Sequence, residues 1–301
     1  MEIFNGKAIY QPTGKAAEYA KWACNFFVGC SNICEYCYCK KGILASAMGQ
    51  DKPQLKKCFK DETHAIEVFK KELKQNLSEL QQHGIFFSFT TDPMLPETQQ
   101  LTYMACGIAL HQYQIPVTIL TKRADWVDGF LEFMENSNSD NKSREWRKNL
   151  AVGFTLTGHD ELEPHASTNS ERIEAMKKLH DAGFKTIASI EPIIDFMSSA
   201  KMIKAIQRFC NLIKIGLMSG QSYDYQELFN FFDYITLGFC NEIPIYWKDS
   251  LLKAVGINRE DLPKNCVTRD YNIFTNNTNE EFVNIKEFFK ELGAVDVDIE
   301  H

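Results

Sequence analysis

The sequence lacks any hydrophobic run long enough to cross a bilayer. Its longest apolar stretches, such as residues 85–89 and 187–190, have the length of strands, whereas a membrane-spanning helix needs about 20 apolar residues. The first ten residues also lack the basic region and apolar stretch that mark a secretory signal. The sequence therefore predicts a cytoplasmic protein with no membrane partner.

An excess of basic charge is missing as well. The chain has 33 Lys and Arg against 40 Asp and Glu, a formal net charge of −7, which argues against non-specific nucleic-acid binding. The charge is uneven, since residues 40–74 hold nine Lys against five acids and residues 270–301 hold eight acids against two Lys. Both segments fit solvated faces, and the basic one also fits a rim beside an active site.

Common nucleotide-binding and nucleophile motifs are absent: the sequence has no G-x-G-x-x-G, no Walker-type loop and no Ser-centred elbow. The ten cysteines do not predict a disulfide scaffold, because the chain is long and shows no secretion signal. Four of the ten fall between Cys30 and Cys39, and the others are scattered singly. One short segment therefore concentrates the thiols of the chain.

Short apolar runs alternate along the chain with amphipathic segments. The runs predict strands at residues 22–28, 85–89, 117–121, 150–156, 185–190, 212–215 and 234–239. The amphipathic segments predict helices at residues 63–82, 97–113, 123–135, 169–182, 198–210 and 223–232, with an exposed loop at 136–149. This alternation predicts an α/β fold, a partial or complete parallel (β/α) barrel with a C-terminal α/β extension.

Three regions are expected along the chain. Residues 1–20 form an N-terminal extension, residues 21–240 the barrel core, and residues 241–301 a C-terminal cap packed on the barrel. The cap is predicted to contain a helix at 247–255, a second helix near 280–292 and a strand at 295–299. Within the core, Thr168 and Glu171 form a capping-box sequence that predicts the start of a helix, and Gly183 marks its end.

The most informative motif is the C-x3-C-x2-C triad of Cys30, Cys34 and Cys37, which directly follows a predicted strand. Three thiolates on one tight loop can hold three irons of a [4Fe–4S] cluster and leave the fourth iron open to an exogenous ligand. The alternative is a non-enzymatic iron–sulfur or structural zinc protein. Zinc would need a fourth ligand, and Cys39 is too near for the usual paired spacing.

This spacing, with Tyr36 just before the last cysteine, resembles the signature of the radical S-adenosylmethionine superfamily. Further segments are similar to its spore-photoproduct-lyase-like branch, also labelled DNA repair photolyase-like. They are C-x3-C-x-Y-C-Y at residues 30–38, T-D-P at 91–93, T-K at 121–122, E-P at 163–164 followed by Arg172, and E-P at 191–192. The resemblance covers about residues 20–220.

The resemblance implies an enzyme with a [4Fe–4S] cluster and S-adenosyl-L-methionine as cofactors. Reductive cleavage would give a 5′-deoxyadenosyl radical that abstracts hydrogen from a substrate, with an external reductant such as flavodoxin or ferredoxin as partner. The substrate and the catalytic residues stay open. A DNA lesion, and hence a lyase that binds nucleic acid, is one candidate, although the overall acidity speaks against extended duplex binding.

Candidate cofactor-binding residues follow from the same resemblance, and several lie at predicted carboxyl ends of strands, where parallel barrels gather their reactive groups. Lys122 is expected to neutralise the methionyl carboxylate, Tyr36 to contact the adenine region, and Glu163 with Arg172 to form a structural or cofactor-side pair. The full set is Tyr36, Tyr38, Thr91, Asp92, Lys122, Thr155, Glu163, Arg172 and Glu191.

Overall fold

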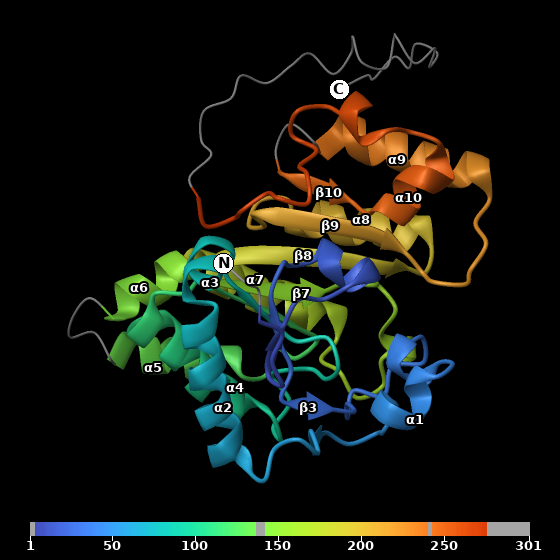
Figure 1. The fold of residues 1–301 in the computed structure, drawn as a ribbon. Coiled ribbons are helices and arrows are strands. Elements are labelled where there is room, and N and C mark those ends of the chain that lie inside the picture. Colours follow the sequence, from blue (N-terminus) through green and yellow to red (C-terminus); the bar gives the residue numbers. More distant parts are fainter. Residues whose placement is uncertain (1–3, 137–141, 240–242, 276–301) are drawn as a thin grey trace.

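A computed structural model describes residues 4–136, 142–239 and 243–275 of the chain, without the side chains of residues 142–145. Its main feature is an eight-stranded sheet (Figure 1) in the order β1-β2-β5-β6-β7-β8-β9-β10. Only β1 and β2 are antiparallel, and every later pair is parallel. The strands are β1 (Ile9–Tyr10), β2 (Ala23–Cys24), β5 (Ile85–Phe87), β6 (Val117–Thr121), β7 (Leu150–Thr155), β8 (Lys185–Ile193), β9 (Leu212–Leu217) and β10 (Ile245–Trp247).

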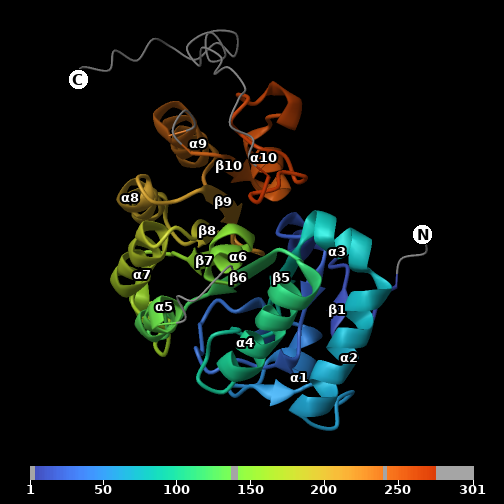
Figure 2. The ribbon, with the colours of Figure 1, turned by 90° about the vertical axis from the view of Figure 1, so that its left-hand side faces the viewer.

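Helices link successive strands, and Figures 1 and 2 show them along the sheet. They are α1 (Leu44–Met48), α2 (Glu62–Gln75), α3 (Leu77–His83), α4 (Gln99–Gly107), α5 (Val127–Asn136), α6 (Lys142–Asn149), α7 (Asn169–Asp181), α8 (Phe196–Ile206), α9 (Tyr225–Phe239) and α10 (Asp249–Val255). A separate hairpin pairs β3 (Phe27–Val28) with β4 (Gln54–Leu55). The predicted α/β fold is confirmed as a partial parallel barrel.

The central strands of the sheet are buried along their whole length. All six residues of β7 and all six of β9 are buried, as expected for parallel strands covered on both faces. The capping box of α7 is also confirmed: Thr168 accepts from the backbone N–H of Glu171, and the Glu171 carboxylate accepts from that of Thr168. Gly183 follows the helix with φ of 87°, a backbone conformation that suits glycine.

Two predicted elements near the N-terminus are each divided in two. Residues 22–28 do not form one strand, because the chain leaves the main sheet after β2 and starts the β3–β4 hairpin. The buried Asn25 side chain accepts from the backbone N–H of Phe89 and donates to the Tyr10 hydroxyl at this break. Residues 63–82 form two helices that meet at Asn76, whose side chain is hydrogen-bonded to both backbone groups of Phe4.

Two predictions in the later part of the chain are also wrong, and the helix predicted at 247–255 is confirmed with a later start. Residues 234–239 are not a strand but the last turns of α9, which buries residues at helical spacing such as Leu228, Phe232 and Ile235. The expected loop at 136–149 contains helix α6. Trp247 belongs to β10, so the helix there starts at Asp249. The helix predicted near 280–292 and the strand at 295–299 lie outside the described residues.

The N-terminal segment is built into the core. The carboxylate of Glu72, on α2, accepts hydrogen bonds from the backbone N–H groups of Lys7, Ala8 and Ile9, at 2.6–2.9 Å. Gly6 permits this approach, because a Cβ there would lie 2.1 Å from the Glu72 Cδ. Farther along, the short helix η1 (Gly14–Glu18) packs near β9 and β10, where Glu18 Oε1 accepts from the backbone N–H of Asp249 at 2.7 Å.

No helix in the described part of the chain is both long and apolar enough to span a membrane.

Candidate functional site

The three motif cysteines lie on one tight loop, residues 29–39, called here the cysteine loop. Cys30, Cys34 and Cys37 are free thiols, and all three line one cavity of about 360 Å³. Gly29 starts the loop with φ of 83°, and a Cβ there would lie 2.5 Å from the carbonyl oxygen of Lys52. The backbone N–H of Cys30 then donates to the carbonyl of Gln50 at 3.0 Å. These contacts hold the first cysteine against the cavity.

The thiols differ in their electrostatic environment. Burial raises the pKa of Cys30 to about 12, with a further contribution from the charge of Asp92. Burial also raises the pKa of Cys34. The pKa of Cys37 is lowered, chiefly because the Cys39 thiol is hydrogen-bonded to it. Thiolates are the form that binds metal, and the charge of Lys122 partly offsets the effect of burial on Cys34.

Three thiolates with an open cavity beside them fit the donor set of a [4Fe–4S] cluster with one iron left for another ligand. In the described part of the chain, no three His, Cys, Asp or Glu side chains surround a single point as one metal ion would require. A cubane cluster places each thiolate on a different iron, so its ligands need not share one point. Cys30, Cys34 and Cys37 are the residues that would hold it.

Most of the predicted cofactor-binding residues line the same cavity. They come from the cysteine loop and from the carboxyl ends of β5, β6, β7 and β8: Tyr36, Tyr38, Thr91, Asp92, Lys122, Thr155 and Glu191. Neither Glu163 nor Arg172 is in this lining, since both are buried behind it, with exposed fractions of 2% and 0%. The alignment of strand ends therefore gathers these residues at one mouth of the barrel, as their positions in the sequence predict.

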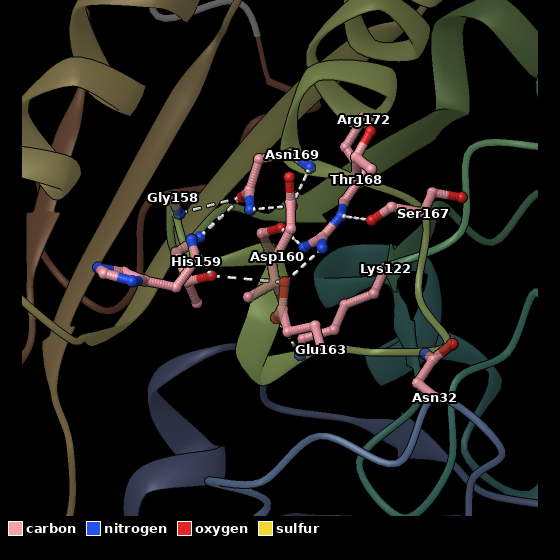
Figure 3. Close-up of polar contacts among 12 residues, drawn as sticks. Asn32, Lys122, Gly158, His159, Asp160, Glu163, Ser167, Thr168, Asn169 and Arg172 are labelled. Carbon is pink, nitrogen blue, oxygen red and sulfur yellow. Dashed lines mark hydrogen bonds and ion pairs between the residues drawn. The ribbon is translucent and has the colours of Figure 1, made fainter.

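Glu163 and Arg172 form a buried ion pair behind the cavity wall (Figure 3). The Arg172 guanidinium also donates to the carbonyl oxygens of Ser167 at 2.7 Å and Thr155 at 2.6 Å. The other oxygen of Glu163 accepts from the Tyr36 hydroxyl and lies 4.0 Å from the Lys122 Nζ. The pair thus supports two residues that do line the cavity.

Lys122 places a positive charge close to Cys34 and Tyr36 of the cysteine loop. Burial alone would lower its pKa, but the charges of Cys34 and Glu163 outweigh burial and raise the pKa of Lys122. Its Nζ also lies 5.5 Å from the centre of the Tyr36 ring, within the range of a cation–π interaction. The ammonium form is therefore favoured at the cavity wall, where it offsets negative charge on Cys34.

Asp92 lines the cavity, but its carboxylate is fully engaged inside the protein. Its Oδ1 accepts from the Thr121 hydroxyl at 2.6 Å and the Met94 backbone N–H at 3.0 Å. Its Oδ2 accepts from the Asn32 amide at 2.8 Å and the Lys122 backbone N–H at 2.7 Å. A carboxylate offers about four lone-pair positions, so Asp92 joins the cysteine loop to the ends of β5 and β6.

Two further cavity residues, Tyr19 and Lys248, come from outside the stretch of family resemblance and meet at Glu191. The Tyr19 hydroxyl donates to Glu191 Oε2 and is hydrogen-bonded to the Ser189 hydroxyl, both at 2.6 Å. Lys248 forms an ion pair with the same Glu191 oxygen at 2.7 Å, and its Nζ lies 4.2 Å from the centre of the Tyr19 ring. Gly216 leaves the space for this pair, because a Cβ there would lie 2.7 Å from the Lys248 side chain.

Sequence reasoning missed Tyr19, Ser189 and Lys248 as cavity residues, and it missed Asn32 within the cysteine loop. Tyr19 and Lys248 stand in the predicted extension and cap, where no motif indicated a role. Asn32 could have been noticed as a polar residue between two motif cysteines, and Ser189 as an inward position two residues before Glu191 on β8.

The radical SAM superfamily sequence model matches residues 24–195, which is more than half of the chain. None of the curated proteins compared matches it. The fold is similar to crystal structures of Streptococcus suis SuiB. SuiB bound to S-adenosylmethionine is 13% identical with a TM-score of 0.48, over 76% of this chain and 50% of SuiB. SuiB bound to the precursor peptide SuiA is 14% identical with a TM-score of 0.39, over 63% of this chain and 42% of SuiB.

The chain belongs to the radical SAM superfamily. The cofactors of this family are a [4Fe–4S] cluster and S-adenosylmethionine. The chain spans about half the length of the SuiB structures that it matches.

Proposed function

We propose that Cys30, Cys34 and Cys37 hold the [4Fe–4S] cluster and that S-adenosylmethionine binds beside it in the cavity. The observation that carries this proposal is that the three free thiols line one cavity of about 360 Å³ together with the polar residues at the strand ends. The cavity lies at the carboxyl ends of parallel strands, where barrels of this type place their chemistry.

When bound and reduced, the cofactor pair supplies a 5′-deoxyadenosyl radical that can remove a hydrogen atom from a substrate. The protein itself binds and orients S-adenosylmethionine. Lys122 faces the cysteine loop with its ammonium and can pair with the methionyl carboxylate. The Glu163–Arg172 pair holds Tyr36 in place against the cavity. Thr155 and Glu191, which line the cavity, would offer oxygen atoms to the ribose hydroxyls of the bound cofactor.

The narrower likeness to spore photoproduct lyase stays a prediction, because the matching sequence model reaches only the superfamily. A DNA lesion remains a candidate substrate on the strength of the T-D-P and T-K segments. An external flavodoxin or ferredoxin is the expected electron donor. Thymine dinucleotides that carry the lesion, incubated under anaerobic reducing conditions, test this candidate substrate. Formation of the repaired dinucleotide would support it.

The cofactor proposal is tested by anaerobic reconstitution with iron and sulfide. The wild-type chain is expected to bind about four irons and to release 5′-deoxyadenosine from S-adenosylmethionine on reduction. Cys34→Ser is expected to lose both, whereas Cys58→Ser, which removes a cysteine outside the cavity, is expected to keep both. Stable binding of zinc by the wild type without any such release would instead support the zinc-protein alternative.

A further inference from the structure

A second cavity lies at the amino ends of the strands, and it is called here the amino-end cavity. Its lining includes Ile85 and Leu212, the first residues of β5 and β9. Its volume is about 390 Å³, which is in the range of cavities that hold small ligands, whereas a closed parallel barrel fills its interior with side chains. Tyr19 and Leu120 line both this cavity and the one beside the cysteine loop. No cysteine of the described chain lines it.

Residues 266–275, called here the strap, close this end of the barrel. The strap is hydrogen-bonded to β10 at its start, and farther along the Asn272 amide donates to the carbonyl of Gln82, on α3, at 3.1 Å. Ile273 lies between these regions in a cluster with buried residues of β7, β8, β9 and β10. Because Ile273 and Phe274 also line the cavity, the strap forms one of its walls.

Lys214, on β9, is a buried cation in the cavity lining. It is 8% exposed, and its Nζ donates to the backbone carbonyl oxygens of Glu18 at 2.8 Å and Tyr19 at 3.0 Å. An ammonium group has three N–H donors, so one is left for another acceptor. Among the described residues no carboxylate forms an ion pair with Lys214, and the two whose charges raise its pKa, those of Glu18 and Glu191, are paired with Lys248.

The other permanent cations of the lining differ from Lys214 because they have counterions. Lys21 is paired with Glu79 at 2.8 Å, and Arg269 with Asp249 at 2.7 Å. Lys214 instead has two tyrosine rings, whose centres lie 5.2–5.3 Å from its Nζ. A buried charge without a counterion is costly, and a ring face offsets only part of that cost. An anion at Lys214 would therefore be stabilised more strongly than one at the mouth of the cavity.

We infer that the amino-end cavity binds a small organic carboxylate, whose anionic group pairs with Lys214 while its apolar part lies against Phe86, Ile187 and Ile273. The three apolar residues line the cavity, and each is at most 8% exposed. One remaining N–H donor suits a single carboxylate, whereas a phosphate group calls for several donors. The carboxylate of the lining, Asp270, belongs to an exposed residue and so does not compete for the buried ammonium.

Titration calorimetry with phenylpropionate and phenylpropanol tests this inference, because the two probes differ only in the end group. Burial lowers the pKa of Lys214 to about 7, so the ammonium form dominates at about pH 6. The wild type should bind the carboxylate at least about ten-fold more tightly than the alcohol, since a hydrogen bond between charged groups is the stronger one. Equal affinities, no binding of phenylpropionate, or tighter binding of inorganic phosphate would overturn the inference.

Two variants locate the binding. Lys214→Met should abolish the preference for the carboxylate, whereas Lys201→Met, at an exposed position of α8, should keep it. Thr118→Phe leaves Lys214 in place and fills part of the cavity that Thr118 lines, so both probes should bind about ten-fold more weakly or worse. A preference that survives in Lys214→Met, or unchanged binding in Thr118→Phe, would contradict the assignment.

S-adenosylmethionine distinguishes the two cavities. Saturating amounts should leave the affinity for phenylpropionate unchanged, because Lys214 does not line the cavity beside the cysteine loop. Full displacement of phenylpropionate would place its binding beside the cysteine loop and overturn the inference. The inference does not rest on the proposed function, since neither the cluster nor S-adenosylmethionine takes part in it.

Discussion

Replacing Arg172 by Met tests whether the buried ion pair supports the cavity wall. The change removes hydrogen bonds to Ser167 and Thr155 and the partner of Glu163, whose side chain is fully buried. Breaking a buried pair costs about 3–5 kcal/mol. Lys122 lies 4.0 Å from the remaining carboxylate and partly compensates it, so the lower value of about 3 kcal/mol is expected.

This loss translates into a measurable shift in melting temperature. Unfolding entropy is about 2.1 cal/mol/K per residue, so about 3 kcal/mol lowers the Tm of a chain of 301 residues by about 5 °C. Thermal unfolding followed by circular dichroism gives the shift, and the exposed Arg208→Met is the matched control, expected within about 0.5 kcal/mol of wild type. The double variant with Glu163→Gln should lose less than the sum of the two single variants. Strictly additive losses, or a cost below about 1 kcal/mol for Arg172→Met, would refute the reasoning.

Two further predictions concern lysines. Lys122→Ala should still bind about four irons, but its affinity for S-adenosylmethionine should fall about ten-fold. Calorimetry measures this affinity, with Lys57→Ala as the control, and an unchanged affinity would remove Lys122 from the site. Burial, with a smaller contribution from the charge of Lys248, lowers the pKa of Lys214 from 10.5 to about 7. The unfolded chain then binds the extra proton between these values, so stability should rise with pH across that range by about 1.4 kcal/mol per unit. Urea unfolding at pH 7.5 and 9.5 should show this rise in the wild type and not in Lys214→Met, and parallel slopes would contradict it.

Much of the fold could be predicted from the sequence because its signals are local. Strand β6 has the predicted bounds, 117–121, since a short apolar run between two polar segments leaves little choice. The prediction of secondary structure failed where contacts between residues far apart in the sequence determine where an element begins or ends. The break between α2 and α3 at Asn76 depends on a contact with Phe4, more than 70 residues away. Residues 234–239 alone predict a strand, and only the buried face of the whole of α9 shows the helical spacing.

The candidate site was predictable where strand ends carry polar residues, as at Thr91, Lys122 and Glu191. What the sequence could not supply is which of these groups are already occupied. Asp92 looks like a free carboxylate in the sequence, and only the structure shows its four donors. The place of Tyr19 in the site could not be predicted for another reason, because its contact with Glu191 joins residues 172 positions apart.

The anchoring of the N-terminal segment has a practical consequence for protein engineering. A fragment trimmed to the stretch shared with the superfamily, residues 24–195, would omit η1, β9 and β10. A milder trim that removes only the first 20 residues would strip Lys214 of the two carbonyl oxygens that it contacts, those of Glu18 and Tyr19, and would deprive Lys248 of a carboxylate. The smallest unit that can be expressed with an intact cavity therefore starts upstream of the recognisable family region and extends well past its end.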